Sequence, residues 1–240
     1  MQSLQPSVTA EAPWVAFHQT LTTGMVMLFK PLRRDLTESS RRCEFCPNLL
    51  TSLKAYVLEE EGTGRTVYAG PKCAAGNIAS KYTLAGIPDL TKFTLSKNDG
   101  EGRVGGNGAS GISKAIDPSR HALEYLLLRE GKLAKDMNLS YPVLKEYYSK
   151  SLTESLTDAE ILHVNRIEAK APEKFKLANL QKCYNYLFWI DVAIERLPND
   201  KADFLGAIRA ALLKNGSISM GQKVAVNKWL AKIPGVPQLK

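Results

Sequence analysis

Three of the four cysteines in this sequence have the spacing of metal ligands. Cys43 and Cys46 form a CxxC pair, and Cys73 follows later in the chain. In a protein without a secretory signal, this pattern indicates a metal site before a disulfide. A redox role for the pair is disfavoured because no thioredoxin-like βαβ pattern surrounds it. Since zinc at a structural site takes four thiolate or imidazole ligands, the sequence predicts a zinc site on these three cysteines.

The local spacing does not supply the fourth zinc ligand. A treble-clef zinc finger would place it about three residues after Cys73, where the sequence has Gly76 and Asn77. Two distant residues are candidates, His18 near the N-terminus and Cys183 in the second half of the chain. Cys183 lies on an apolar helical stripe, which is typical of a small core residue, so His18 is the assigned candidate. A site completed by another group, or one that has lost its metal, is the alternative.

The elements that would position these cysteines are short. Apolar runs predict three strands, at residues 25–29, 55–58 and 65–70. The turn-rich residues 61–64 join the last two strands into a β-hairpin, and Pro71 suits the first position of a helix that carries Cys73 in its first turn. A cysteine knuckle, a hairpin and a helix with a ligand follow one another in this order in a treble clef. We therefore expect an α+β fold, with a treble-clef-like zinc-finger domain over residues 1–97.

A glycine-rich stretch separates this domain from the rest of the chain. Residues 98–116 cannot bury enough side chain to offset the entropy of ordering, which predicts a loop or linker. The stretch contains Gly100, Gly102 and Gly105 in a GxGxxG pattern, but helical sequence follows instead of the βαβ unit of a dinucleotide site. An arm that becomes ordered on nucleic acid is the alternative to a plain linker.

Residues 117–240 have the pattern of an all-α helical bundle. Apolar residues from Leu180 to Leu197 recur at steps of three and four, which predicts one long helix between Pro172 and Pro198. The apolar faces of two further helices are expected at Phe204, Leu205, Ile208 and Leu212, and at Val226, Leu230 and Ile233.

The bundle contains two similar segments. Residues 155–170 align without gaps to residues 217–232, and each segment begins with a capping box of the form S/T-x-x-E/Q. Asn165 and Asn227 fall at equivalent places, where we expect a polar outer face. The similarity predicts an internal duplication within a compact bundle of about five helices.

The chain is basic, with 32 Lys and Arg against 24 Asp and Glu and a formal net charge of +8. Such a balance suits an anionic partner. The candidate nucleic-acid-binding residues lie around the cysteines and in the glycine-rich stretch: Lys30, Arg33, Arg34, Arg41, Arg42, Lys72, Arg103 and Asn107. Arg103 and Asn107 are suited to base edges, and the others to backbone phosphates. A solvated charged face is the alternative.

Catalytic motifs are missing from the sequence. The three histidines form no HExxH motif and have no recognisable nucleophile motif to pair with, and there is no GxxxxGKS/T phosphate loop. We therefore expect a binding protein and not an enzyme. No apolar run reaches the roughly 18 residues of a membrane span, and the N-terminus lacks a secretory signal. A cytoplasmic location without membrane contact is expected.

Cys43, Cys46 and Cys73, with the GPKCA sequence around the last, give this basic chain a family resemblance. It resembles the reduced large subunit of type IV CRISPR-Cas effector complexes, in the domain order of nearly the whole chain. The resemblance implies a non-catalytic subunit that contacts the 5′ handle of the guide RNA, reads the protospacer-adjacent motif in target DNA and helps to open the duplex. The implied partners are guide RNA, target double-stranded DNA with its displaced strand, CRISPR backbone subunits and, in one branch of the family, a DinG-type helicase.

Two other classes of protein fit the same residues. A free-standing phage or plasmid protein that binds single-stranded nucleic acid, or regulates transcription, would use the same basic surface. It would bind DNA alone, whereas an effector subunit would copurify with guide RNA. An adaptor for protein interactions with a structural finger would show no salt-dependent binding to nucleic acid.

Overall fold

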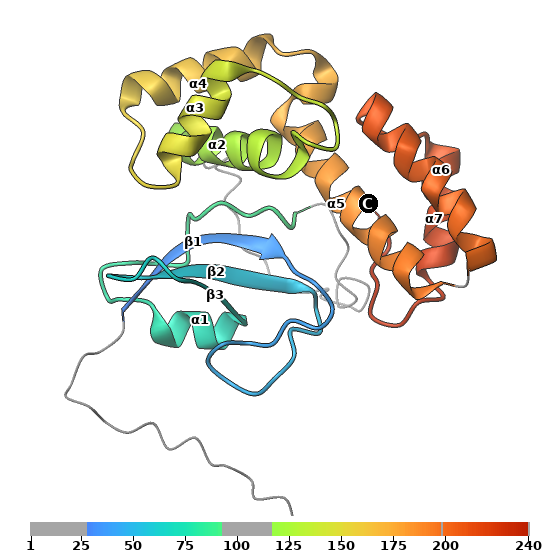
Figure 1. The fold of residues 1–240 in the computed structure, drawn as a ribbon, viewed down its shortest axis with the longest axis horizontal. Coiled ribbons are helices and arrows are strands. Elements are labelled where there is room, and N and C mark those ends of the chain that lie inside the picture. Colours follow the sequence, from blue (N-terminus) through green and yellow to red (C-terminus); the bar gives the residue numbers. More distant parts are fainter. Residues whose placement is uncertain (1–27, 93–116, 198, 240) are drawn as a thin grey trace, which may run out of the picture.

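The computed structural model describes residues 28–92, 117–197 and 199–239, with only the backbone described for residues 199–201. A small antiparallel sheet lies beside a group of helices, and one short helix, α1, lies on the other side of the sheet (Figure 1). This arrangement confirms the predicted α+β class. The predicted linker at residues 98–116 lies outside the described residues.

The sheet consists of β1 (Phe29–Leu36), β2 (Lys54–Glu60) and β3 (Thr66–Ala69), in the order β1-β2-β3. β2 and β3 form the predicted antiparallel hairpin, and its turn contains Gly62 at φ 93° and Gly64 at φ 69°. Glycine suits both positions because a Cβ atom disfavours positive φ. The antiparallel pairing of β1 with β2 is interrupted by a β-bulge at Leu32, between Pro31 and Arg33.

Prolines and polar caps begin several of the helices. The helices are α1 (Pro71–Asn77), α2 (Pro118–Leu126), the π-helix η2 (Leu127–Leu133), α3 (Pro142–Ser151), α4 (Asp158–Lys170), the 3-10 helix η3 (Glu173–Phe175), α5 (Leu177–Arg196), α6 (Asn199–Asn215) and α7 (Met220–Leu230). Pro71 begins α1 as predicted, and Cys73 lies in the first turn of that helix. Within the described parts of the chain, no helix combines the length and apolarity that a membrane span requires.

Two details of the predicted helices are wrong. Pro172 does not begin the long helix, because a 3-10 turn follows it and α5 starts only at Leu177. Phe204 does not share the buried face of α6, since it is 41% exposed while its neighbour Leu205 is fully buried. Adjacent helical residues point about 100° apart, so the contact of Leu205 with the core turns Phe204 toward solvent.

The two similar segments form α4 and α7, and both capping boxes are present. Their equivalent asparagines do more than form a polar outer face. Asn165 Nδ2 donates to the carbonyl of Pro118 (3.1 Å), at the start of α2. Asn227 donates to the carbonyl of Leu239 (3.0 Å) and accepts from its N–H (2.7 Å). Each asparagine therefore holds a distant segment against its helix, while the duplication itself stays a prediction.

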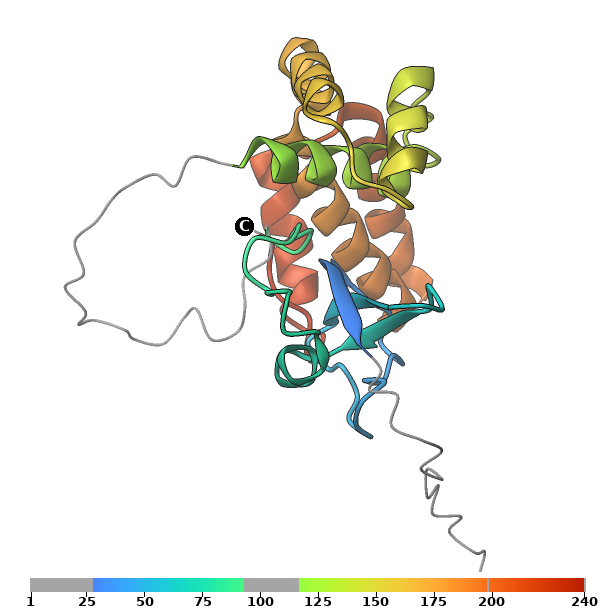
Figure 2. The same cartoon turned by 90° about the vertical axis from the view of Figure 1, so that its left-hand side faces the viewer.

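The buried apolar residues form two clusters, and the sheet contributes to both. The smaller cluster lies between the sheet, the cysteine loop and α1, and includes Phe29, Leu58, Val67, Ala69 and Ala74. The larger cluster fills the helical part, and three leucines from the N-terminal region belong to it: Leu36, Leu53 and Leu90. α1 and the other helices lie on opposite sides of the sheet (Figures 1 and 2). The sheet region and the helices therefore share a core.

Buried polar groups also join the N-terminal region to the helices. Asn185 in α5 is fully buried, and its Nδ2 donates to the carbonyl of Leu90 (2.8 Å). The buried carboxylate of Glu124 in α2 accepts from Lys92 Nζ (2.8 Å) and from the N–H of Asp89 (3.1 Å). These contacts have defined geometry, so they fix how the sheet region sits on the helices.

Candidate metal centre

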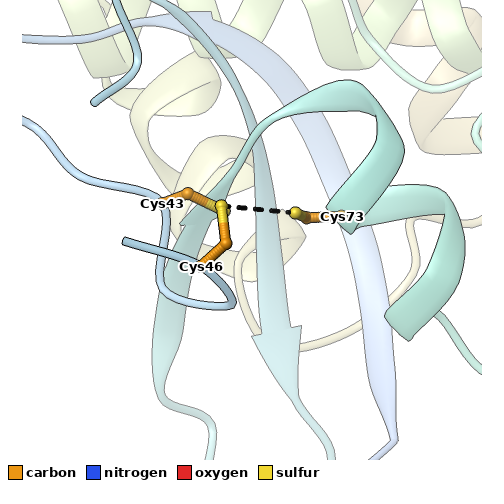
Figure 3. A group of neighbouring side chains, drawn as sticks. All are labelled: Cys43, Cys46 and Cys73. Atoms are coloured by element: carbon orange, nitrogen blue, oxygen red, sulfur yellow. Dashed lines mark hydrogen bonds between the residues drawn. The ribbon is translucent and has the colours of Figure 1, made fainter. Parts of the chain in front are cut away.

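Three cysteine thiols meet beside the sheet. Cys43 and Cys46 lie in the loop between β1 and β2, Cys73 lies in α1, and their side chains point toward one another (Figure 3). Their Sγ atoms all lie within 4.8 Å of one another, and Cys46 Sγ is 3.6 Å from Cys73 Sγ. The three cysteines therefore lie close enough to hold one metal ion, as the sequence predicts.

Backbone hydrogen bonds fix the loop that carries the CxxC pair. The N–H of Cys43 donates to the carbonyl of Asn48 (2.9 Å), which closes the loop on itself. The N–H of Glu44 donates to the carbonyl of Tyr68 in β3 (3.0 Å). Because α1 follows β3 almost directly, the same strand positions both the loop and the helix that carries Cys73.

The surroundings of the cysteine centre shift the pKa values of Cys43 and Cys73 in opposite directions. Burial alone would raise the pKa of Cys43, but backbone hydrogen bonds from Gly70 and Phe45 and the thiols of Cys46 and Cys73 together lower it below its usual 9.0. Hydrogen bonds with Cys46 and Cys43, together with burial and the charges of these two groups, raise the pKa of Cys73 to about 11. A divalent cation favours the deprotonated form of every thiol that it binds. Metal binding here would therefore release protons.

The described residues supply three thiol ligands and no fourth. Gly76 has no side chain, and the amide of Asn77 donates to the carbonyl of Cys73 (2.8 Å). Cys183 lies in the core of the helical part, apart from the cysteine group, and burial raises its pKa to about 12. Its prediction as a core residue is confirmed. His18 lies outside the described residues.

Carboxylates of the chain hold three of the predicted phosphate-binding arginines. The pairs are Arg33 with Asp35 (2.8 Å), Arg34 with Asp89 (3.7 Å) and Arg41 with Glu38 (2.6 Å). In each pair, the nearby carboxylate offsets the charge of the arginine, and this weakens the attraction between the arginine and an external phosphate. These three arginines are therefore less available to an external phosphate than their charge alone suggests.

The other predicted cations are more open. Lys30, Arg42 and Lys72 are exposed, and none has a carboxylate within ion-pair distance in the described parts of the chain. Among the described residues, the Arg42 side chain donates to the carbonyl of Pro47 (3.0 Å). Arg103 and Asn107 lie outside the described residues.

Two tyrosines beside the arginines were missed by sequence reasoning. The guanidinium carbon of Arg34 lies 5.8 Å from the ring centre of Tyr56, and that of Arg41 lies 4.6 Å from the ring centre of Tyr68. Such cation–π contacts hold an arginine in place and leave some of its N–H groups available. The sequence signal that could have indicated these contacts was the presence of one tyrosine in each of the two predicted hairpin strands.

We compared the chain with family models, curated proteins and solved structures, and none of them matches. Function is therefore inferred from the residues and from their geometry.

Proposed function

We propose that this chain is a non-catalytic nucleic-acid-binding protein in which zinc holds Cys43, Cys46 and Cys73 together. The observation that carries the proposal is the position of two exposed cations at the cysteine centre. Arg42 directly precedes Cys43, and Lys72 directly precedes Cys73. A metal that ties the loop to α1 would fix the backbone positions of these two cations on the two segments that meet at the cysteine centre. Fixed cations are what the recognition of successive phosphates on a strand requires.

Zinc is the metal that this donor set favours. Thiolates are soft ligands, and a CxxC pair with a later cysteine supplies three of the four ligands of a closed zinc site. We propose His18 as the fourth ligand, because imidazole is the other common donor at such sites. The relation of this unit to treble-clef fingers is part of the same proposal.

Metal content is the first test. Freshly purified protein should contain about one zinc ion per chain by elemental analysis. Cys43→Ser should lose the zinc and lower the melting temperature, and His18→Ala should weaken zinc retention. Cys183→Ala removes a cysteine outside the centre, so this matched control should keep its zinc. A wild-type protein without zinc, together with an unchanged melting temperature for Cys43→Ser, would overturn the metal assignment.

Salt-dependent binding is the second test. Fluorescence anisotropy with short labelled oligonucleotides should show an affinity that falls steeply as salt rises. Arg42→Ala and Lys72→Ala should each weaken binding and reduce the slope of log affinity against log salt by about one. Lys214→Ala changes a lysine in the last turn of α6 and serves as the control. A wild-type protein that binds no strand would contradict nucleic-acid binding and favour a protein-interaction adaptor.

The complex in which the protein acts is the most specific part of the proposal. From its resemblance to type IV CRISPR-Cas large subunits, the chain would contact the guide 5′ handle, read the protospacer-adjacent motif and help to open the target. A tagged protein expressed from its native operon should copurify with short RNAs that share a 5′ end and with a repeated backbone subunit. Protein that arrives alone, or with mixed nucleic acid, would contradict this role and favour a free-standing phage or plasmid binder.

A further inference from the structure

A pocket lies between the edge of the sheet and the helices, away from the cysteine centre. Its volume is about 410 Å³, within the usual range for small-molecule sites. Four parts of the chain form its walls: residues 30–33 of β1, residues 87–88, α2 with the start of η2, and the connection between α3 and α4 at residues 151–156. Figure 1 shows β1 running beneath α2 on this side of the molecule.

The pocket lies along residues 30–33 of β1, between the points where the edge of this strand is bridged to Ile78 and to Asp89. Past the bulge at Leu32, the N–H of Arg34 donates to the carbonyl of Pro88 (2.8 Å), and Arg34 accepts from the N–H of Leu90 (2.9 Å). Before the bulge, Pro31 has no N–H to offer to another strand. β-Bulges are often found beside binding sites because they redirect side chains from the regular alternation. This part of the edge is therefore poorly suited to pairing with another strand, and it lines the pocket instead.

The walls combine apolar surface with positive charge. The apolar part includes Leu32 and Ile87 and four leucines from the helical side: Leu123, Leu127, Leu152 and Leu156. Lys30 stands at one side, exposed and without an ion pair in the described residues. Arg33 also lines the pocket, and its Nε is bound to Asp35, which leaves both terminal nitrogen atoms for another acceptor. Ser119 and Thr153 add hydroxyl groups, whereas Glu154 is the one acidic residue among the described lining residues.

We infer that this pocket holds a single unpaired nucleotide of a bound nucleic-acid strand. The base lies against the leucines, and its phosphate lies on Lys30 and Arg33. This inference rests on the proposed function, because it takes a strand as the ligand. The walls offer apolar side chains, hydroxyl groups and two cations within one small volume, and a nucleotide matches them with an apolar base face, hydrogen-bonding edges and a negative charge. Since none of the described residues that line the pocket is aromatic, the base is held by aliphatic contact and hydroxyl groups, with little preference among bases.

The test blocks the pocket without changing its charge. Leu152→Trp fills the space from a wall residue that is 54% exposed, so folding should tolerate it. Leu162→Trp is the matched control, because Leu162 is 49% exposed on α4 and does not line the pocket. Anisotropy with labelled oligo(dT) and oligo(U) should show a loss of affinity of about 5-fold or more for Leu152→Trp alone. Its salt slope should stay unchanged, whereas Lys30→Ala should lower the slope by about one.

A strand without bases separates base binding from phosphate binding. Wild type and Leu152→Trp should bind an abasic strand of the same length equally well, because that strand has nothing to place in the pocket. If Leu152→Trp does not fold, Thr153→Trp blocks the same wall from an exposed position. If the blocking and control variants change the affinity for a strand equally, and wild type binds that strand, the assignment of the pocket as a nucleotide site is wrong. The proposed function would be unaffected by that result. Failure of wild type to bind any strand would overturn both.

Discussion

Replacement of Asp35 by asparagine should weaken the contact between the sheet and the helices. The Asp35 side chain in β1 is only 1% exposed, and four groups donate to its carboxylate. They are Arg33 Nε (2.8 Å), Lys132 Nζ (2.7 Å), the Tyr184 hydroxyl (2.7 Å) and the N–H of Leu36 (2.9 Å). Lys132 comes from η2 and Tyr184 from α5, so one carboxylate joins the sheet to two helical elements.

The size of the effect follows from what the asparagine amide cannot do. Asp35→Asn keeps the shape and one acceptor oxygen, but its NH₂ group cannot accept from Arg33 or Lys132. Removing one partner from a fully buried ion pair costs about 3–5 kcal/mol. The side chains of Lys132 and Arg33 are 27% and 18% exposed, so water can replace part of the lost interaction. We therefore expect the free energy of unfolding to fall by about 2–4 kcal/mol.

The same carboxylate gives the effect a pH dependence. Burial alone would raise the pKa of Asp35, but the charges of Lys132 and Arg33 and their hydrogen bonds hold it below its usual 3.8. Because the unfolded chain binds this proton more tightly, the stabilisation is complete above pH ~4 and is lost as pH falls through the lower folded value. The difference in stability between wild type and Asp35→Asn should therefore be constant near neutral pH and shrink below pH ~4.

Urea unfolding, followed by far-UV circular dichroism and by tryptophan fluorescence, to which the buried Trp189 contributes, measures both effects. Asp191→Asn is the control, because Asp191 also pairs with an arginine, Arg209 (2.6 Å), but its side chain is 41% exposed. That variant should lose less than about 1 kcal/mol. The stabilising role of the Asp35 carboxylate would be refuted if Asp35→Asn lowered the free energy of unfolding no more than Asp191→Asn does. It would also be refuted if the difference in stability between wild type and Asp35→Asn stayed unchanged in acid.

Two further predictions concern the helices. Leu205→Ala should lower the free energy of unfolding by about 2–5 kcal/mol because Leu205 is fully buried, whereas Phe204→Ala should cost less than about 1 kcal/mol at its 41% exposed position. Equal losses in urea unfolding would contradict the observed face of α6. Asn227→Ala should cost about 1–3 kcal/mol, because it removes the two hydrogen bonds that the Asn227 side chain makes with the N–H and carbonyl of Leu239. Hydrogen exchange should become faster at the C-terminal residues of this variant, and unchanged exchange there would show that Asn227 does not anchor them.

Features that depend on neighbouring residues were predictable from the sequence. The hairpin follows from two apolar runs around a glycine-containing turn, and the start of α1 follows from Pro71. The capping boxes of α4 and α7 depend on residues three positions apart. The cysteine group could be predicted because a short loop, one hairpin and one helical turn leave few ways to separate Cys46 from Cys73.

Features that depend on distant residues were not predictable. Arg34 has the charge of a phosphate ligand, and only the folded chain shows that Asp89 lies beside it. Lys132 has no nearby sequence signal for its partner Asp35, because the two residues meet only when η2 packs over β1. Pairing of this kind is decided by the tertiary packing, which local charge patterns do not encode.

The strand β1 contributes to three features of the molecule: the pocket, the buried contacts of Asp35 and the cysteine centre. Arg33 and Asp35 point to the same side of the strand, so one residue lines the pocket while the other reaches the helices. The strand then leads into the loop that carries Cys43. A shift of one residue in register would turn each of these side chains to the opposite face. The bulge at Leu32 sets the register at this point. The pocket and the buried hydrogen bonds of Asp35 therefore both depend on this bulge.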